Sequence, residues 1–159
     1  KPDGVLPAFR KLRDQKAVRF LGITGHEDAV ILRRAIETYE FDTLLTTLNP
    51  VSRRRPFRDD LLPAANRKKM GIIAMKVMGG GNGCLAAGNP PKQLIQLFHD
   101  DTSNQVSAGT LVRYALGLPI SVAVIGVASV EQLRENVSAA AEAAPLGAEE
   151  RKALEDRLG

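Results

Sequence analysis

Residues 71–77 read Gly71-Ile72-Ile73-Ala74-Met75-Lys76-Val77, a nearly continuous apolar run with a lysine near its end. Short, uninterrupted apolar runs are typical of strands in a parallel sheet that is covered on both faces. Three other runs have the same character, at residues 18–23, 42–46 and 121–127. The sequence therefore predicts four strands, each separated from the next by enough chain for a helix.

Helices are predicted on either side of these strands, because apolar residues recur there at helical spacing. The predicted helices cover residues 6–15, 29–39, 57–66, 107–116, 130–143 and 149–158. Thr24 with Glu27, and Ser129 with Gln132, have the spacing of a capping box at a helix start. Strands that alternate with helices in this way indicate an α/β fold built from parallel βα units.

Residues 79–104 interrupt the alternation. The segment opens with Gly79-Gly80-Gly81-Asn82-Gly83 and continues through Asn89-Pro90-Pro91, so we expect an elaborated loop after the third strand. We expect residues 1–159 to form one domain, with a C-terminal tail helix within residues 147–159.

Composition excludes several classes of protein. Cys84 is the single cysteine and no Cys/His cluster has metal-ligand spacing, which disfavours a secreted disulfide scaffold and a zinc site and favours a reducing, cytoplasmic location. No apolar run reaches the roughly 18 residues of a membrane helix. The net charge of +4 is dispersed and aromatic residues make up 4%, so nucleic acid is not an expected partner.

Chain length leaves two architectures open. A closed (β/α)₈ barrel takes about 250 residues, so 159 residues with four units suit half of a barrel or an open doubly wound sheet. The turn after the first strand reads Gly22-Ile23-Thr24-Gly25-His26 and lacks a Gly-x-Gly-x-x-Gly motif. This absence disfavours a dinucleotide fold of the Rossmann kind.

Ligands of parallel α/β folds bind at the carboxyl ends of the strands. Lys76 and the glycines from Gly79 onward follow a strand, where backbone N–H groups can bind phosphate; the alternative is a flexible loop. A buried Lys76 is also a candidate Schiff-base nucleophile of a phosphate-binding lyase. His26 is either a ligand contact or a structural residue, and Ser129 is either an anion contact or a helix cap.

Several stretches, taken in order and with their spacing, match a known pattern. They are Lys16-Ala17-Val18-Arg19-Phe20-Leu21-Gly22-Ile23-Thr24-Gly25-His26; Phe41-Asp42-Thr43-Leu44-Leu45 with Asn49-Pro50; Gly71-Ile72-Ile73-Ala74-Met75-Lys76; and Arg113-Tyr114-Ala115-Leu116, followed by Val124-Ile125-Gly126-Val127-Ala128-Ser129-Val130-Glu131-Gln132-Leu133 and Asn136. The chain resembles the aldo-keto reductase family over strands five to eight of its barrel.

The resemblance implies a (β/α)₈ barrel that binds NADPH or NADH and transfers hydride to a carbonyl. It places no catalytic Asp, Tyr, Lys or His of the family in this chain. Thr24, Gly25 and Met75 stand at nicotinamide positions, and Gly79 and Gly80 resemble the loop near the pyrophosphate. Lys76, which follows Met75 in the matching stretch, is also an expected cofactor contact. The adenosine positions are Ser129, Gln132 and Asn136, and Gln132 replaces an arginine that often pairs with the 2′-phosphate.

We therefore interpret the chain as the cofactor-binding C-terminal half of an aldo-keto reductase, either a truncated piece or a separately encoded half. Its expected partners are a nicotinamide cofactor and either the missing N-terminal half or a second copy of itself. Two alternatives remain at this stage. One is a non-catalytic half-barrel that self-associates to cover its sheet edges, and the other is the Lys76 lyase.

Overall fold

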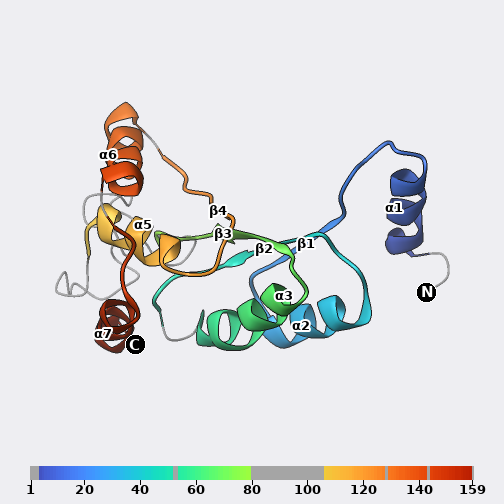
Figure 1. Ribbon diagram of the computed structural model, residues 1–159, viewed down its shortest axis with the longest axis horizontal. Coiled ribbons are helices and arrows are strands. Elements are labelled where there is room, and N and C mark those ends of the chain that lie inside the picture. Colours follow the sequence, from blue (N-terminus) through green and yellow to red (C-terminus); the bar gives the residue numbers. More distant parts are fainter. Residues whose placement is uncertain (1–3, 52–53, 80–105, 128, 143, 159) are drawn as a thin grey trace.

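The computed structural model describes residues 4–51, 54–79, 106–127, 129–142 and 144–158 (Figure 1). The elements follow one another as α1 (Val5–Asp14), β1 (Gly22–Gly25), α2 (Ala29–Thr38), β2 (Thr43–Thr47), η2 (Phe57–Leu61), α3 (Leu62–Arg67), β3 (Gly71–Met75), α5 (Ala108–Leu116), β4 (Val122–Ala123), α6 (Val130–Glu142) and α7 (Ala148–Leu158). All of the predicted loop 79–104 except Gly79 lies outside the described residues, and with it Gly80 and Cys84.

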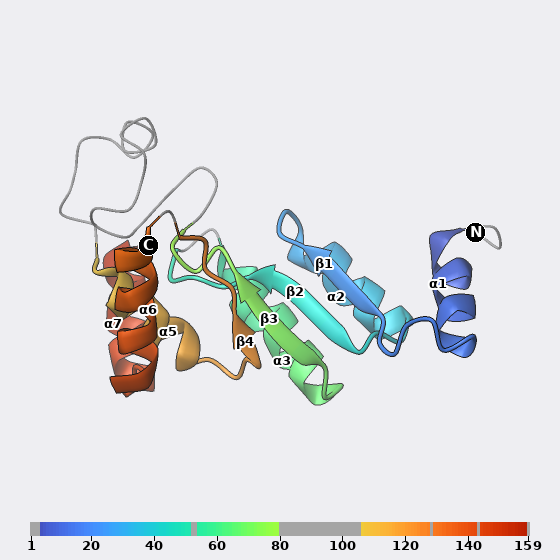
Figure 2. The ribbon, with the colours of Figure 1, turned by 90° about the horizontal axis from the view of Figure 1, so that it is seen from above.

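The four strands form one parallel sheet in the order β1-β2-β3-β4 (Figure 2). Each strand pairs with the next one in the chain, so the strand order never reverses. A doubly wound sheet has such a reversal, whereas a (β/α)₈ barrel does not. The predicted fold class is confirmed, and the sheet order selects the barrel-type architecture over the doubly wound one.

Helices α2 and α3 cover one face of the sheet, as Figures 1 and 2 both show. On β2 and β3, the buried Leu44 and Ile72 face these helices, while Leu45 and Ile73 on the opposite face are only half-buried. The side chain of Val122 on β4 is 50% exposed. Within the part of the chain that the structure describes, the expected coverage of both faces is thus found only on the face that α2 and α3 cover.

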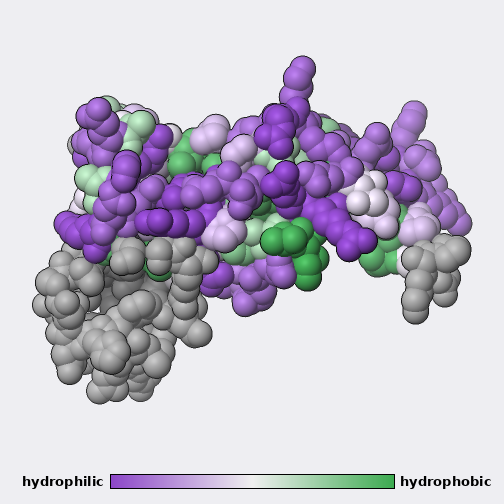
Figure 3. Space-filling view, turned by 90° about the horizontal axis from the view of Figure 1, so that it is seen from below, coloured by the Kyte–Doolittle hydropathy of each residue, from purple (hydrophilic) through white to green (hydrophobic). Residues whose placement is uncertain are grey.

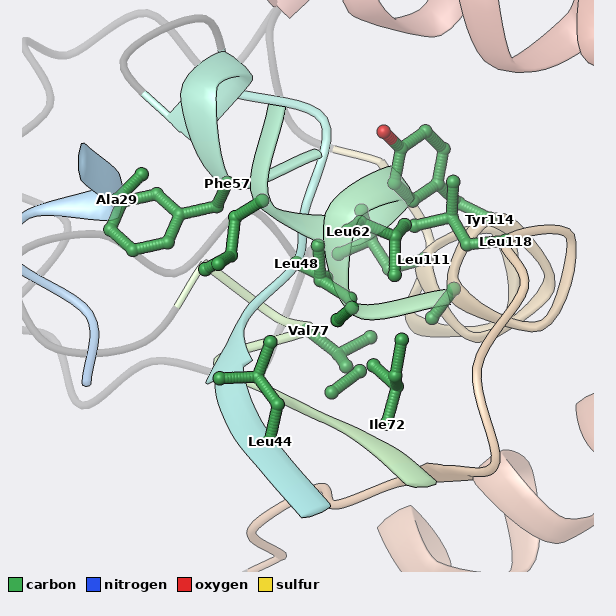
Figure 4. Close-up of a cluster of buried hydrophobic side chains, with 14 of the residues drawn as sticks. Ala29, Leu44, Leu48, Phe57, Leu62, Ile72, Val77, Leu111, Tyr114 and Leu118 are labelled. Atoms are coloured by element: carbon green, nitrogen blue, oxygen red, sulfur yellow. The ribbon is translucent and has the colours of Figure 1, made fainter. Parts of the chain in front are cut away.

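The hydrophobic core fills the space between the covered face and the helices (Figure 4). Leu44 and Ile72 come from the sheet, Leu61 from η2, and Leu111 and Tyr114 from α5. All five are at most 1% exposed. Seen from below, on the side where Figure 1 places α2 and α3, the described surface is mostly hydrophilic with a small hydrophobic patch (Figure 3). On α2, Val30 and Ile31 are exposed beside the polar residues of that helix.

The first strand begins later than predicted. Residues 18–23 were expected to form it, but β1 covers Gly22–Gly25, and Val18 and Phe20 are 38% and 63% exposed. The Asp42 carboxylate accepts a hydrogen bond from the Leu21 N–H at 2.7 Å, immediately before the paired register begins at Gly22 and Thr43. Pairing with β2, rather than the apolar run itself, sets the start of the strand.

The start of α2 also differs from its prediction. Thr24 lies within β1, so it cannot form the expected capping box with Glu27. Asp28 is the N-cap instead, and its carboxylate accepts hydrogen bonds from the N–H groups of Val30 and Ile31 at 2.8 and 3.0 Å. An aspartate at this position satisfies two otherwise unpaired helix donors. The predicted cap at Ser129 is present, since its hydroxyl accepts from the Gln132 N–H at 3.3 Å.

A cluster of polar side chains fastens α7 to the rest of the chain. The Tyr114 hydroxyl donates to Glu155 at 2.7 Å, and the Arg58 guanidinium lies 2.7 Å from the same carboxylate oxygen. Arg58 also forms a two-pronged pair with Asp59. Tyr114 is fully buried, and the Arg58 and Glu155 side chains are only 13% and 14% exposed. The cluster thus joins η2, α5 and α7 through ionic hydrogen bonds.

This cluster predicts a loss of stability at alkaline pH. Burial raises the pKa of Tyr114 above its ordinary value, an effect reinforced by the Glu155 carboxylate and opposed by Arg58. Above about pH 10 an unfolded tyrosine loses its proton while folded Tyr114 keeps it, so the free energy of unfolding falls by up to about 1.4 kcal/mol per pH unit. We expect Tyr114→Phe to flatten this slope in urea titrations between about pH 10 and 11.5.

Tyr39→Phe is the matched control, because Tyr39 is 43% exposed. It should keep the wild-type slope of unfolding free energy against pH. If Tyr114→Phe and Tyr39→Phe gave the same slope, the buried tyrosine would not be the source of the effect.

Among the described residues, no helix is both long and apolar enough to span a membrane. Within the same ranges, no group of three or more His, Cys, Asp or Glu side chains is arranged to hold a metal ion.

Candidate functional site

Side chains from three neighbouring strand ends meet at the carboxyl edge of the sheet. His26 follows β1, Asn49 follows β2 and Lys76 follows β3, and these three strands are adjacent in the sheet. The Lys76 ammonium nitrogen lies 3.0 Å from Nδ1 of His26. The Asn49 amide donates to the Lys76 carbonyl at 3.0 Å. The parallel topology thus brings together residues that lie up to 50 positions apart in the chain.

The backbone of Lys76 adopts a conformation that lysine rarely takes, with φ of 54°. Lys16 and Lys69 also have positive φ, but each follows a helix, where this conformation is a usual way to end one. Lys76 instead follows β3 directly. Its carbonyl accepts hydrogen bonds from the Asn49 amide and from the Gly79 N–H, the latter at 2.8 Å, and these contacts stabilise the unusual turn.

Asn49 was a candidate from the sequence only because it lies on the carboxyl side of a predicted strand, without an assigned role. It is 3% exposed, and its side-chain oxygen accepts from the Val51 N–H at 3.2 Å while its amide nitrogen donates to Lys76. An asparagine three residues after a predicted strand was visible in the sequence. Its partner, a lysine carbonyl in a left-handed turn 27 residues later, was not.

Arg54 is a residue that the sequence prediction left out of the site. Its guanidinium donates to the His26 carbonyl and lies over the Phe57 ring, 5.8 Å from its centroid. In the sequence Arg54 is the middle residue of three consecutive arginines, a pattern that is usually found on a solvated surface. In the structure it fixes the main chain of His26 instead.

The residues expected at nicotinamide positions, Thr24, Gly25 and Met75, do not all face the same side of the sheet. Thr24 is exposed on the open face of the sheet, in register with Leu45 and Ile73, and Met75 is in register with Thr47. Gly25 is turned toward α2, and a Cβ at this position would lie 3.0 Å from the Leu32 side chain. The structure thus places Thr24 and Met75 on the open face and Lys76 at its edge.

The residues expected at adenosine positions form a second group: Ser129 directly precedes α6, and Gln132 and Asn136 lie within it. Asn136 is 8% exposed, and neither polar atom of its side-chain amide has a partner among the described residues. With Ile125, Val112 and Val137 it lines an apolar groove of about 270 Å³ between α5, α6 and the segment after β4. A buried amide without hydrogen bonds is costly unless a further group satisfies it.

A carboxylate already occupies the N-terminus of α6. The pKa of Glu131 is lowered by a hydrogen bond from its own backbone N–H and by one from the Ser129 hydroxyl. The Ser129 hydroxyl therefore serves Glu131 as well as the helix start. This negative charge disfavours a second anion at the same helix end.

Gly79 is buried and has φ of 87°, a conformation that favours glycine. Gly80 lies outside the described residues. The structure brings Lys76, Gly79, His26 and Asn49 together at the carboxyl ends of the strands. Ser129, Gln132 and Asn136 form a separate group, at the start of α6 and within it.

The comparisons with known proteins agree with the sheet topology. No protein-family model matches the sequence, and no curated protein matches it. Among solved structures, the chain is similar to the crystal structure of a thermostable aldo-keto reductase, Tm1743, in complex with the inhibitor epalrestat. The TM-score is 0.60 and the sequence identity 22%, over 96% of this chain and 53% of that chain.

The chain thus spans about half the length of that reductase. At this sequence identity the similarity shows the fold: a parallel sheet with alternating helices that matches part of an aldo-keto reductase barrel.

Proposed function

We propose that this chain is the cofactor-binding portion of a nicotinamide-dependent carbonyl reductase, with the acid–base groups of the reaction supplied from outside it. The observation that carries this proposal is the Lys76 ammonium, which is held at the carboxyl edge of the sheet by His26 and by the Asn49-supported turn. Barrel enzymes bind their ligands at this edge. A lysine here is a partner for a phosphate group of a dinucleotide.

The residues present fit a dinucleotide at both of its ends. Met75 directly precedes Lys76, and Thr24 lies on the same open face of the sheet, where the nicotinamide end would bind. Asn136 supplies an amide whose buried oxygen and nitrogen have no partner among the described residues, in a groove with apolar walls, which suits a purine base. The bound cofactor would supply the hydride, and the residues named here would bind and orient it.

The charge at the start of α6 bears on the choice of cofactor. Gln132 is neutral, and Glu131 is an anion whose pKa is lowered. Neither of these two residues supplies a positive charge for a 2′-phosphate. We therefore expect NADH to bind at least as tightly as NADPH. Calorimetric titration of the purified chain with each dinucleotide tests this, and a clear preference for NADPH would contradict it.

Lys76→Met tests the proposed site most directly. Removing a charge-assisted hydrogen bond costs about 1.5–3 kcal/mol, so dinucleotide affinity should fall about 10- to 100-fold. Lys69→Met is the matched control, because Lys69 has a nearly identical φ of 56° but is exposed in the turn that precedes β3, at the other end of that strand. Saturable binding that is equally strong in both variants would rule out Lys76 as a phosphate contact.

We also propose that the open face of the sheet is covered by a partner, either an N-terminal half-barrel or a second copy of the chain. Leu45, Ile73 and Val122 share one row of this face and are half-buried or exposed. Strands β1 and β4 are the sheet edges, whose unpaired backbone groups also favour association. Solution mass distinguishes the two partners: a dimer of the chain alone supports the second copy, and a stable monomer supports the N-terminal half.

Self-association without nucleotide binding is the second candidate function, and the exposed apolar row favours it. A well-folded dimer that binds neither NADH nor NADPH would support it over the reductase proposal. A reducing, cytoplasmic location, suggested by the single Cys84, remains part of either proposal.

A further inference from the structure

Nδ1 of His26 lies beside two groups with opposite requirements. The Lys76 ammonium nitrogen is 3.0 Å away, and a carboxylate oxygen of Glu27 is 2.6 Å away. An ammonium group can only donate hydrogen bonds and an ionised carboxylate can only accept them. A ring nitrogen carries either a lone pair or a hydrogen. It can therefore form a full hydrogen bond with only one of these two neighbours at a time.

The surroundings favour the bond to Lys76. The Glu27 side chain is 83% exposed, and pairs that involve such exposed groups contribute little. The main chain of Lys76 is held by Asn49 and Gly79, and the carbonyl of His26 is held by Arg54. Because both residues are anchored through their backbones, joining their side chains costs less conformational entropy than joining two free ones.

We propose that His26 is a positioning residue for Lys76, and that Glu27 competes with Lys76 for the same ring nitrogen. In the competent arrangement Nδ1 accepts a hydrogen bond from the ammonium group, Nε2 carries the ring hydrogen, and the other ammonium hydrogens are free to bind a phosphate group. When Nδ1 carries the hydrogen and donates to Glu27, Lys76 loses this support. The consequence for cofactor affinity rests on the proposed function, whereas the pairing of His26 with Lys76 does not.

Affinity measurements on matched variants test the positioning role. His26→Asn keeps a hydrogen-bond acceptor near the place of Nδ1, and His26→Leu has a similar size without one. We expect His26→Leu to weaken NADH binding about tenfold, the loss of roughly one hydrogen bond. His26→Asn should remain within about threefold of the wild type. Equal affinities for the two variants would overturn the proposal.

A double-mutant cycle separates competition from simple charge repulsion. If Glu27 acts by competing for Nδ1, Glu27→Gln strengthens NADH binding in the wild type and has no effect in the His26→Leu background. If the gain is the same in both backgrounds, Glu27 acts only as a nearby negative charge, and the competition is refuted.

The ring hydrogen can be located without any ligand, by ¹⁵N NMR of the labelled full chain. We expect Nδ1 of the wild type to have the shift of an unprotonated nitrogen, and Lys76→Met to move the hydrogen to Nδ1, where Glu27 accepts it. An Nδ1 already protonated in the wild type, or unchanged in Lys76→Met, would overturn the pairing. If the NMR result holds while no dinucleotide binds, the proposed function fails and the pairing of His26 with Lys76 stands.

Discussion

Glu155→Leu is expected to lower the free energy of unfolding by about 3 kcal/mol, the lower end of the range for removing one partner of a buried ion pair. The substitution leaves the Arg58 guanidinium with one carboxylate instead of two and leaves the buried Tyr114 hydroxyl without its acceptor. Because Glu155 is the group through which α7 contacts both residues, we expect α7 to loosen first. Urea unfolding measures the loss, and hydrogen exchange locates it.

Asp156→Asn is the matched control on the same helix. Asp156 is the next residue, its side chain is 55% exposed, and it pairs with the exposed Lys152 at 2.6 Å. Exposed pairs of this kind contribute little to stability, because water and salt screen them. A similar loss of stability in both variants would mean that the buried cluster does not hold α7 in place.

Leu44→Ala is expected to cost about 3 kcal/mol, in the range for removing a leucine side chain from a closely packed core. Leu44 is 0% exposed and belongs to the cluster between the sheet and the helices (Figure 4). The cavity left by the deleted carbons cannot be filled by water without exposing apolar walls. The midpoint of urea unfolding should therefore move to a distinctly lower concentration.

Leu45→Ala is the natural comparison, because Leu45 is the next residue on β2 and faces the opposite, open side of the sheet. In the chain alone we expect it to cost about 1 kcal/mol or less, as for substitutions at incompletely buried positions. Losses of equal size for the two leucines in a monomer would contradict one-sided coverage. If the chain dimerises, Leu45→Ala should weaken the dimer, whereas Leu44→Ala should act mainly on folding.

The sheet shows how far local patterns reach. The apolar runs at residues 42–46 and 71–77 predicted β2 and β3 closely, because both strands lie in the middle of the sheet and pair on both sides. The two edge strands were predicted less well. The apolar runs at residues 18–23 and 121–127 are compatible with an extended chain. The paired segments are nevertheless only Gly22–Gly25 and Val122–Ala123, because each edge strand can pair only where its single neighbouring strand lies beside it.

Helix starts depend on a similar distinction. Ser107 and Ser129 each directly precede the helix that they cap, and neither belongs to a strand. Their caps therefore depend only on neighbouring residues in the chain. Thr24 had equally suitable spacing to Glu27 but was drawn into β1 by its pairing with Leu45. Asp28 then became the cap. Where a strand and a cap claimed the same residue, pairing across 21 positions prevailed over local spacing.

The sequence by itself determined the alternation of strands and helices, and with it the α/β class, because periodicity and turn residues act over a few neighbouring positions. Only the tertiary structure decided the strand order, the single covered face and the meeting of His26, Asn49 and Lys76 at one edge. These features depend on which strands lie side by side. That arrangement arises from contacts between distant residues, and no local pattern encodes the left-handed turn that presents Lys76 to His26.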